Sequence, residues 1–422
     1  MPEPLQHIKA IRIVNDSRFV PPRWVEYAYY AYVFYGMVGP AWGLSVGMLS
    51  GGMLAVLAVF CIMRLGSRAT PVYEPIALPF GCTISYVILQ LFVHGASLMD
   101  GSVRGFIDWI QMLIIVQGLA LRHGFLHRFA LAAFVMGLPG LQHLKVAERA
   151  GGYERVGLER GKNEYALANA NSLGSWFGFC AVYFILVAIE TKRTMVRLIS
   201  GLAAVGCLYI VGLTVSRSTL LAVAIATIVA LRHLLKGGFL PVLCLVMLSW
   251  VLYIAGVFDQ AGAQYAARGM QETGRGLVWP LAFERFLNSP LVGVGESNVS
   301  IDVSGRTFTP HNSFLYIALA SGIMPLAFFM AYWWRVVRSA LSAYSKRTDD
   351  TPFYLPLVLY AFLQSMATNG LSGTPWVVVT LCTAIAAGSP HRARRIVLRR
   401  IERRATVAGH GDDASHAIVR YQ

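Results

Sequence analysis

Apolar runs alternate with short polar stretches along nearly the whole chain. A helix that crosses a bilayer needs about 20 mainly apolar residues, and about twelve runs approach that length. They begin near Trp24, Leu44, Ile76, Phe106, Phe129, Leu167, Leu198, Ser218, Phe239, Ser313, Phe353 and Trp376. The pattern predicts an all-α, polytopic membrane protein with about 12 transmembrane helices. We expect one transmembrane domain over residues 1–390 and a basic tail over residues 391–422.

The composition agrees with this prediction. Hydrophobic residues make up 56% of the chain and charged residues 14%, whereas soluble domains carry about 25% charged residues. The net charge of +15 does not indicate nucleic-acid binding, because no soluble segment combines a basic face with interleaved aromatic residues. The 6 cysteines all fall within apolar runs and lack metal-ligand spacing, so neither a metal site nor a disulfide framework is expected.

The positions of basic residues predict the orientation in the membrane. With a cytoplasmic N-terminus, most of the 36 Lys and Arg residues fall on the cytoplasmic side, as the positive-inside rule requires. Both termini are then cytoplasmic. No removable signal peptide is expected, because the polar first stretch lacks an apolar core and a small-residue cleavage site.

Two long segments then lie outside the cytoplasm. Residues 142–166 hold the cations Lys145, Arg149, Arg155, Arg160 and Lys162. Residues 258–312 form the longest connection, and loops of that length are usually functional or disordered. Apolar residues at helical spacing within it, such as Leu277, Leu281 and Phe283, predict short interfacial helices.

Three residues on this external side are candidates for chemistry. Arg217 lies in a tight turn between two apolar runs, beside small hydroxyl residues. Arg275 stands between two glycines, which let a backbone approach a ligand closely. His311 lies between Pro310 and Asn312 at an expected helix start, where the helix dipole disfavours a charged imidazole. Each alone also fits an ordinary interfacial or surface residue.

Together, these three residues fit a lipid diphosphate. Guanidinium groups match phosphate oxygens in a two-pronged geometry, and a neutral histidine can act as a general base. The external side lacks nucleotide sugars and ATP. An enzyme that builds a polymer there needs a donor already activated on a lipid carrier.

The order of these motifs resembles the O-antigen ligase/polymerase superfamily of bacterial inner membranes. Arg217 to Leu221 reads Arg-x-x-x-Leu, and His311 to Gly322 reads His-Asn, nine residues, then Gly. Between these motifs lie Gly274-Arg275, Trp279 and the stretch from Asn288 to Gly295. One departure is Pro325, which stands where the ligase pattern usually has Gly, Thr or Tyr.

The resemblance implies a fold and an activity. It implies an architecture like that of C-type glycosyltransferases, with residues 258–312 as a long periplasmic loop, and metal-independent, inverting transfer without a cofactor. The substrates would be O-antigen on undecaprenyl diphosphate and the lipid A core oligosaccharide. Arg217 and Arg275 would hold the diphosphate, and His311 would activate the acceptor hydroxyl or support the leaving group. Further phosphate contacts would come from Arg149, Arg155, Arg160, Lys162 and Asn312.

Two other functional classes remain open at this point. An O-antigen polymerase or a protein O-oligosaccharyltransferase would use the same donor with a different acceptor. A membrane transporter would instead line a substrate path with residues such as Arg217 and Asp108.

Overall fold

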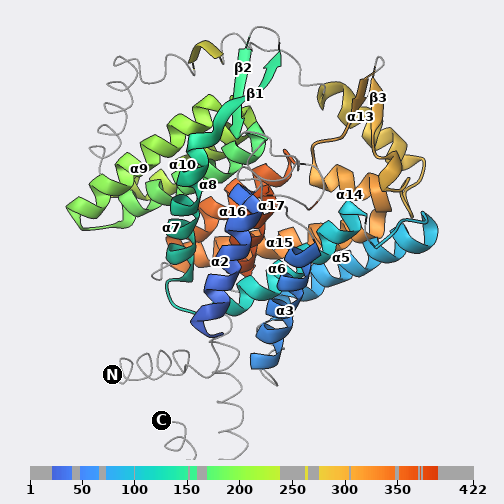
Figure 1. The fold of residues 1–422 in the computed structure, drawn as a ribbon, viewed down its shortest axis with the longest axis horizontal. Coiled ribbons are helices and arrows are strands. Elements are labelled where there is room, and N and C mark those ends of the chain that lie inside the picture. The colour runs from blue at the N-terminus through green and yellow to red at the C-terminus, as the bar shows by residue number, and fades with distance from the viewer. Residues whose placement is uncertain are drawn as a thin grey trace, which may run out of the picture.

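The computed structural model describes residues 21–39, 48–65, 73–98, 100–150, 153–158, 169–237, 262–264, 275–303, 306–346, 351–368, 371 and 374–387. Within these ranges the chain is mostly helical (Figure 1). The α-helices are α2 Arg23–Val38, α3 Met48–Leu65, α5 Ala77–Ile88, α6 Gly101–Leu119, α7 Phe125–Gly137, α8 Ala170–Glu190, α9 Thr194–Leu213, α10 Arg217–Gly237, α13 Arg275–Leu287, α14 Ser313–Ser321, α15 Ile323–Lys346, α16 Thr351–Ser365 and α17 Thr374–Ala387. Short helical turns are η3 Glu74–Ile76, η4 Leu89–Val93, η5 Leu138–His143 and η6 Glu296–Asn298.

The helices have the apolar character of a membrane protein. Among the described residues, 3 helical stretches are long and apolar enough to cross a bilayer: Glu74–Val93, Ala170–Glu190 and Thr194–Leu213. Shorter apolar helices are Gly51–Arg64, Arg217–Leu231 and Pro375–Ala387. The expected run near Phe239 lies outside the described residues, so the number of about 12 spans stays a prediction.

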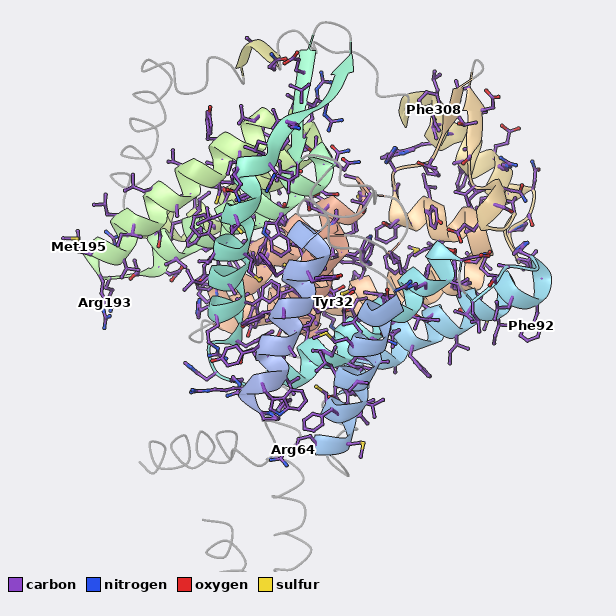
Figure 2. The ribbon with its side chains drawn as sticks, viewed as in Figure 1. Tyr32, Arg64, Phe92, Arg193, Met195 and Phe308 are labelled. Atoms are coloured by element: carbon purple, nitrogen blue, oxygen red, sulfur yellow. The ribbon has the colours of Figure 1, made fainter. Side chains whose placement is uncertain are left out.

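Helices α8, α16 and α17 lie at the centre of the molecule (Figure 1), where α8 packs against both of the others and against α9 and α10. Trp109, Trp176 and Trp376 are almost wholly buried in this core. By contrast, α9 buries one stripe and exposes apolar residues such as Met195, as a helix facing lipid would. Figure 2 shows Met195 and Phe92 pointing away from the helical body.

The tenth apolar run is divided into two helices. Helix α14 ends at Ser321 and α15 begins at Ile323, with Gly322 between them at φ 78°. A Cβ atom at Gly322 would lie 2.3 Å from the carbonyl oxygen of Leu291, so another residue type would not fit. The break therefore requires glycine, for its positive φ and for the close approach of the loop at Leu291.

Two short hairpins modify the prediction of an all-α fold. Strands β1 Leu144–Ala150 and β2 Tyr153–Leu158 pair antiparallel, with an irregularity between Val146 and Glu148. Strands β3 Ile301–Val303 and β4 Arg306–Phe308 form the second hairpin. Both hairpins and α13 lie on the same side of the helical body (Figure 1). Helix α13 fits the short helices expected within residues 258–312.

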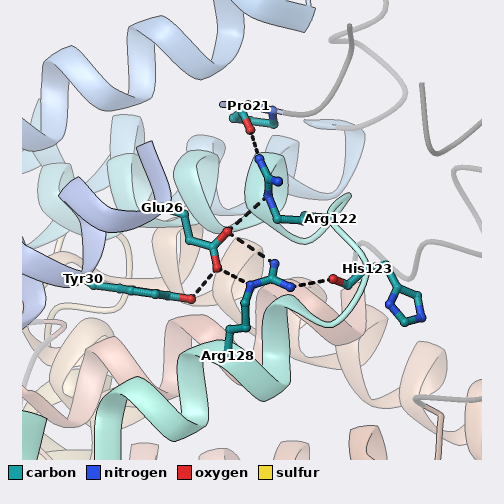
Figure 3. A network of polar contacts seen from close by, with 6 residues as sticks. All are labelled: Pro21, Glu26, Tyr30, Arg122, His123 and Arg128. Carbon is teal, nitrogen blue, oxygen red and sulfur yellow. Dashed lines mark hydrogen bonds and ion pairs between the residues drawn. The ribbon is translucent and has the colours of Figure 1, made fainter. Parts of the chain in front are cut away.

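A buried carboxylate joins the start of α2 to the turn between α6 and α7 (Figure 3). Glu26 is 3% exposed and accepts hydrogen bonds from the Tyr30 hydroxyl at 2.7 Å and from Arg128 Nε at 2.7 Å. Arg122 Nε lies 3.2 Å from the same carboxylate. Arg122 also donates to the Pro21 carbonyl oxygen. Two cations and a phenol compensate for the burial of this charge, as a buried ion requires.

Candidate functional site

Arg217 lies at the start of α10, directly after a sharp turn from α9. The hydroxyl of Thr214 donates to the Val211 carbonyl oxygen at 2.7 Å, and Val215 has a φ of 49°. The side chain of Arg217 is half-buried. Its guanidinium makes no hydrogen bond or ion pair with another of the described residues.

A polar network surrounds this turn. Ser216 Oγ donates to Asn171 Oδ1 at 3.3 Å and lies 3.1 Å from Thr219 Oγ1. Gln364 Nε2 donates to Thr219 Oγ1 at 3.2 Å, which links α16 to the first turn of α10. The close packing depends on Gly174 of α8, since a Cβ atom there would lie 2.8 Å from Thr214 Oγ1.

Arg155 reaches into the same network from strand β2. Its Nε donates to the Thr214 carbonyl oxygen at 3.1 Å, and its terminal nitrogen donates to Asn171 Oδ1 at 2.5 Å. The side chain is 8% exposed. The structure thus brings Arg155, predicted from the charged segment, to the turn that carries Arg217.

The start of α14 belongs to the same region. Asn312 caps this helix, because its Oδ1 accepts from the backbone N–H groups of Phe314 at 3.0 Å and Leu315 at 3.3 Å. Ser313 Oγ donates to the Thr368 carbonyl oxygen at 3.2 Å. The Thr368 hydroxyl in turn donates to the Gln364 carbonyl oxygen at 3.1 Å. Gln364 and Thr368 therefore connect the helix start beside His311 with the helix start at Arg217.

Backbone strain is concentrated in this region. Within the described ranges, the non-glycine residues with positive φ are Val215, at 49°, and His311, at 44°. Positive φ is unfavourable for a β-branched residue such as valine. Strained backbone that the surrounding structure maintains clusters at active sites and ligand clamps. Here one strained residue lies just before Arg217, and the other carries the exposed imidazole.

The electrostatic character of the site favours an anion. Helices α8, α10 and α14 all begin in the network, and each N-terminus carries partial positive charge from its unpaired N–H groups. Arg155 and Arg217 add full positive charges. Within the described part of the chain, no group of three His, Cys, Asp or Glu residues could hold a metal ion.

The other end of α14 is held by the glycine-containing loop. Val294 N donates to the Leu319 carbonyl oxygen at 2.8 Å, and Gly295 N donates to that of Ala320 at 3.1 Å. Gln90 Nε2, from η4, also donates to Ala320 at 2.8 Å. These bonds satisfy carbonyls that a short helix would otherwise leave unpaired. They fix the position of α14, and with it that of His311.

Glu296 completes this support. Its carboxylate accepts a hydrogen bond from the Tyr316 hydroxyl at 2.9 Å, and its backbone N–H donates to Gln90 Oε1 at 3.2 Å. Partial burial raises the pKa of the Glu296 carboxyl above its ordinary value, the Tyr316 hydrogen bond lowers it, and nearby Asp100 raises it further.

An apolar hollow lies beside the site, between α13 and α14. Its volume is about 550 Å³, and Trp279, Pro280, Phe283 and Leu315 contribute to its lining. Trp279 Nε1 donates to the Pro310 carbonyl oxygen at 2.8 Å, which fixes α13 next to His311. The candidate site therefore has an apolar surface next to His311, in addition to the cationic side chains of Arg155 and Arg217.

The structure describes the other predicted residues only in part. Arg149 lies on β1 and Arg275 begins α13, but their side chains lie outside the described part of the structure. Arg160 and Lys162 lie outside the described residues altogether. The network also contains Asn171 and Gln364, which were not among the residues predicted from the sequence. In the sequence, each is a polar amide residue within or at the edge of an apolar run, and this position could have marked it as a candidate.

Residues 165–330 match the family model described as O-antigen ligase. That segment includes Asn171, Arg217, Arg275 and His311. No curated protein matches the chain.

Proposed function

Through residues 165–330 the chain belongs to the O-antigen ligase/polymerase superfamily of bacterial membrane proteins, and we propose that it acts as the ligase. In this reaction O-antigen is transferred from undecaprenyl diphosphate to the lipid A core oligosaccharide. The single observation that carries the proposal is the half-buried Arg217. It directly follows Ser216, which belongs to a polar network that includes Arg155 and extends through Gln364 and Thr368 to the start of α14.

The donor diphosphate would lie against the arginines. Arg217 offers a two-pronged donor to phosphate oxygens, and such charge-assisted hydrogen bonds are stronger than neutral ones. Arg275 would approach from the start of α13, and Arg149, Arg160 and Lys162 would add positive charge from the preceding external segment. We propose that Arg155 contributes mainly by anchoring the turn, because its described hydrogen bonds are to Thr214 and Asn171.

The transfer step itself needs a proton acceptor. The acceptor hydroxyl oxygen attacks the anomeric carbon, and the bond from that carbon to the diphosphate oxygen breaks. The electron pair of the broken bond stays on the diphosphate, where the arginines stabilise the added charge. His311 takes the proton of the attacking hydroxyl. Attack opposite to the leaving group inverts the configuration, and the arginines supply positive charge without a metal ion.

Placement in the cell follows from the charge distribution. The proposal places the protein in the bacterial inner membrane, with both termini cytoplasmic and the site facing the periplasm. Residues 1–390 would form the catalytic membrane domain, and the basic residues 391–422 would contact anionic lipid headgroups.

Gel analysis of lipopolysaccharide from a deletion strain tests the ligase assignment. A ligase is required for every O-antigen attachment, so its loss should remove all bands above the lipid A core. Complementation with the wild-type gene should restore the bands, and complementation with the Arg217→Ala variant should restore them only weakly. A strain that retains one repeat unit on the core would instead identify a polymerase, which the Pro325 departure from the ligase motif also allows. An unchanged band pattern with a defect in glycosylated proteins would identify a protein O-oligosaccharyltransferase.

A further inference from the structure

The orientation of the Asn171 side chain is fixed by its neighbours. Its Oδ1 accepts from an Arg155 terminal nitrogen at 2.5 Å and from Ser216 Oγ at 3.3 Å. A guanidinium can only donate hydrogen bonds, so the amide atom that faces Arg155 is the oxygen. The amide nitrogen must therefore point away from Arg155.

That nitrogen carries two N–H donors. Within the part of the chain that the structure describes, Asn171 Nδ2 has no hydrogen-bond acceptor, and the side chain is only partly buried. Ser216, which holds the oxygen side of the amide, directly precedes Arg217. The Asn171 amide therefore lies next to the turn that carries Arg217, on a side chain that cannot rotate without breaking two hydrogen bonds.

From this geometry we infer that Asn171 contacts the substrate directly and donates a hydrogen bond to an oxygen of the lipid diphosphate. The inference rests on the proposed function and adds a residue to its site. A neutral donor suits this position, because a third cation beside Arg155 and Arg217 would be repelled by both. The amide supplies directional hydrogen bonding without that repulsion.

Two variants separate this role from a structural one. Asn171→Asp keeps an oxygen for Arg155 and Ser216 but removes both N–H donors. Asn171→Ala removes the whole amide. Asn288→Asp is the matched control, because Asn288 is an exposed residue just after α13 and lies outside the network. Thermal melting of each purified variant in detergent checks that it folds.

The measurement is binding of undecaprenyl diphosphate without glycan, compared with binding of the glycan-bearing donor. Both Asn171 variants should bind the bare diphosphate lipid at least roughly tenfold more weakly than wild type, since a hydrogen bond to a charged group is lost. The control variant should bind like wild type. In Asn171→Asp the loss should persist in about 0.5 M salt, where long-range repulsion by the new carboxylate is screened.

Wild-type affinity of folded Asn171→Asp for undecaprenyl diphosphate would overturn the inference. So would a loss confined to the glycan-bearing donor, since Asn171 would then contact sugar rather than phosphate. A loss that salt abolishes would also overturn it. Failure of the proposed function gives a different result, in which the wild-type protein itself binds no lipid diphosphate.

Discussion

At the scale of single residues, the site depends on one charge placed by a strained turn. Arg217 follows Val215 and Ser216, and the turn is held by Arg155 and by the hydroxyl of Thr214. The backbone that carries the guanidinium therefore does not need to be ordered when the substrate arrives. Binding loses less free energy when the group that recognises the ligand is already fixed.

Replacement of Arg217 should weaken the interaction of the protein with the donor diphosphate. Arg217→Ala removes a charge-assisted hydrogen-bond donor worth about 1.5–3 kcal/mol, which corresponds to roughly a ten- to hundredfold slower transfer. Arg217→Lys should restore only part of the rate, because an ammonium group cannot form two parallel hydrogen bonds. Transfer rates of purified variants that insert normally check this prediction. Wild-type rates in Arg217→Ala would favour the transporter hypothesis.

Replacement of His311 should slow the transfer step and leave binding of the donor nearly unchanged. If the imidazole accepts the proton of the acceptor hydroxyl, His311→Ala should lower turnover by about 10²–10⁴-fold and leave donor binding nearly unchanged. Binding and single-turnover rates must be measured separately on the same preparation. Should donor binding fall as far as in Arg217→Ala, His311 is a phosphate ligand instead.

Glu296 predicts a pH dependence of stability. Because burial raises the pKa of its carboxyl in the folded state, the group favours folding most strongly when protonated. This contribution is complete below the ordinary glutamate pKa of about 4.3 and is lost as the pH rises through the folded-state pKa. Glu296→Gln keeps an oxygen for Tyr316 and has no charge to bury. Its melting temperature should exceed that of wild type at pH 7, and the difference should shrink toward pH 4.

At the scale of elements, α14 is a short helix held at both ends. Asn312 and Ser313 hold its start, while Gln90 and the loop at Gly293 and Gly295 hold its end. Each glycine is close to another backbone or side chain; a Cβ atom at Gly293, for example, would lie 2.5 Å from Ser321 N. The loop at Gly293 and Gly295 therefore helps to fix the position of α14, which His311 precedes by two residues.

Gly322→Ala tests this dependence. The added Cβ atom would collide with the Leu291 carbonyl oxygen at 2.3 Å, and alanine disfavours a φ of 78°. We expect the free energy of unfolding to fall by about 1–3 kcal/mol or more. The fraction of the variant that folds should also transfer glycan more slowly. Gly206→Ala in α9 is the control, since a Cβ atom there would meet nothing within 4 Å and alanine favours a helix. Equal melting temperatures for the two variants would contradict the prediction.

The sequence allowed the helices to be predicted better than their breaks and connections. The apolar runs near Trp24, Leu167 and Leu198 correspond to α2, α8 and α9, because lipid imposes apolar stretches on spanning helices. The division at Gly322 was missed, since the run remains apolar across it. The hairpin β1–β2 was missed as well, because its charged residues show no clear alternation with apolar ones.

Among the site residues, Arg217 was predicted from its immediate neighbours in the sequence. The contact of Arg155 with Asn171, and that of Gln364 with Thr219, could not be predicted in this way. The latter pair lies 145 residues apart, so only the packing of α10 against α16 brings it together.

At the scale of the whole molecule, the hairpins, α13 and the candidate site should all lie on one side of the membrane. In Figure 1 the hairpins and α13 lie together on one side of the helical body. Basic residues such as Arg64, at the end of α3, would then mark the cytoplasmic side.

Reporter fusions test this orientation. A reporter that is active only in the periplasm should respond after Gln271 and remain silent after Arg197 and Lys346. The charge distribution underlies this expectation, because cytoplasmic loops retain Lys and Arg. A cytoplasmic response at Gln271 would contradict the proposed mechanism, since the donor chemistry requires that segment to face the periplasm.

The buried carboxylate of Glu26 also has a consequence for biosynthesis. Its partner Arg128 lies 102 residues later, an interval of roughly 5–20 s at a synthesis rate of about 5–20 residues per second. For most of that time Glu26 has been synthesised, but neither of its arginine partners has. An unpaired carboxylate is costly to bury, so the beginning of α2 should remain at the water boundary until the turn between α6 and α7 emerges. Helix α2 should therefore reach its final position late in biosynthesis, although it leaves the ribosome well before the turn between α6 and α7.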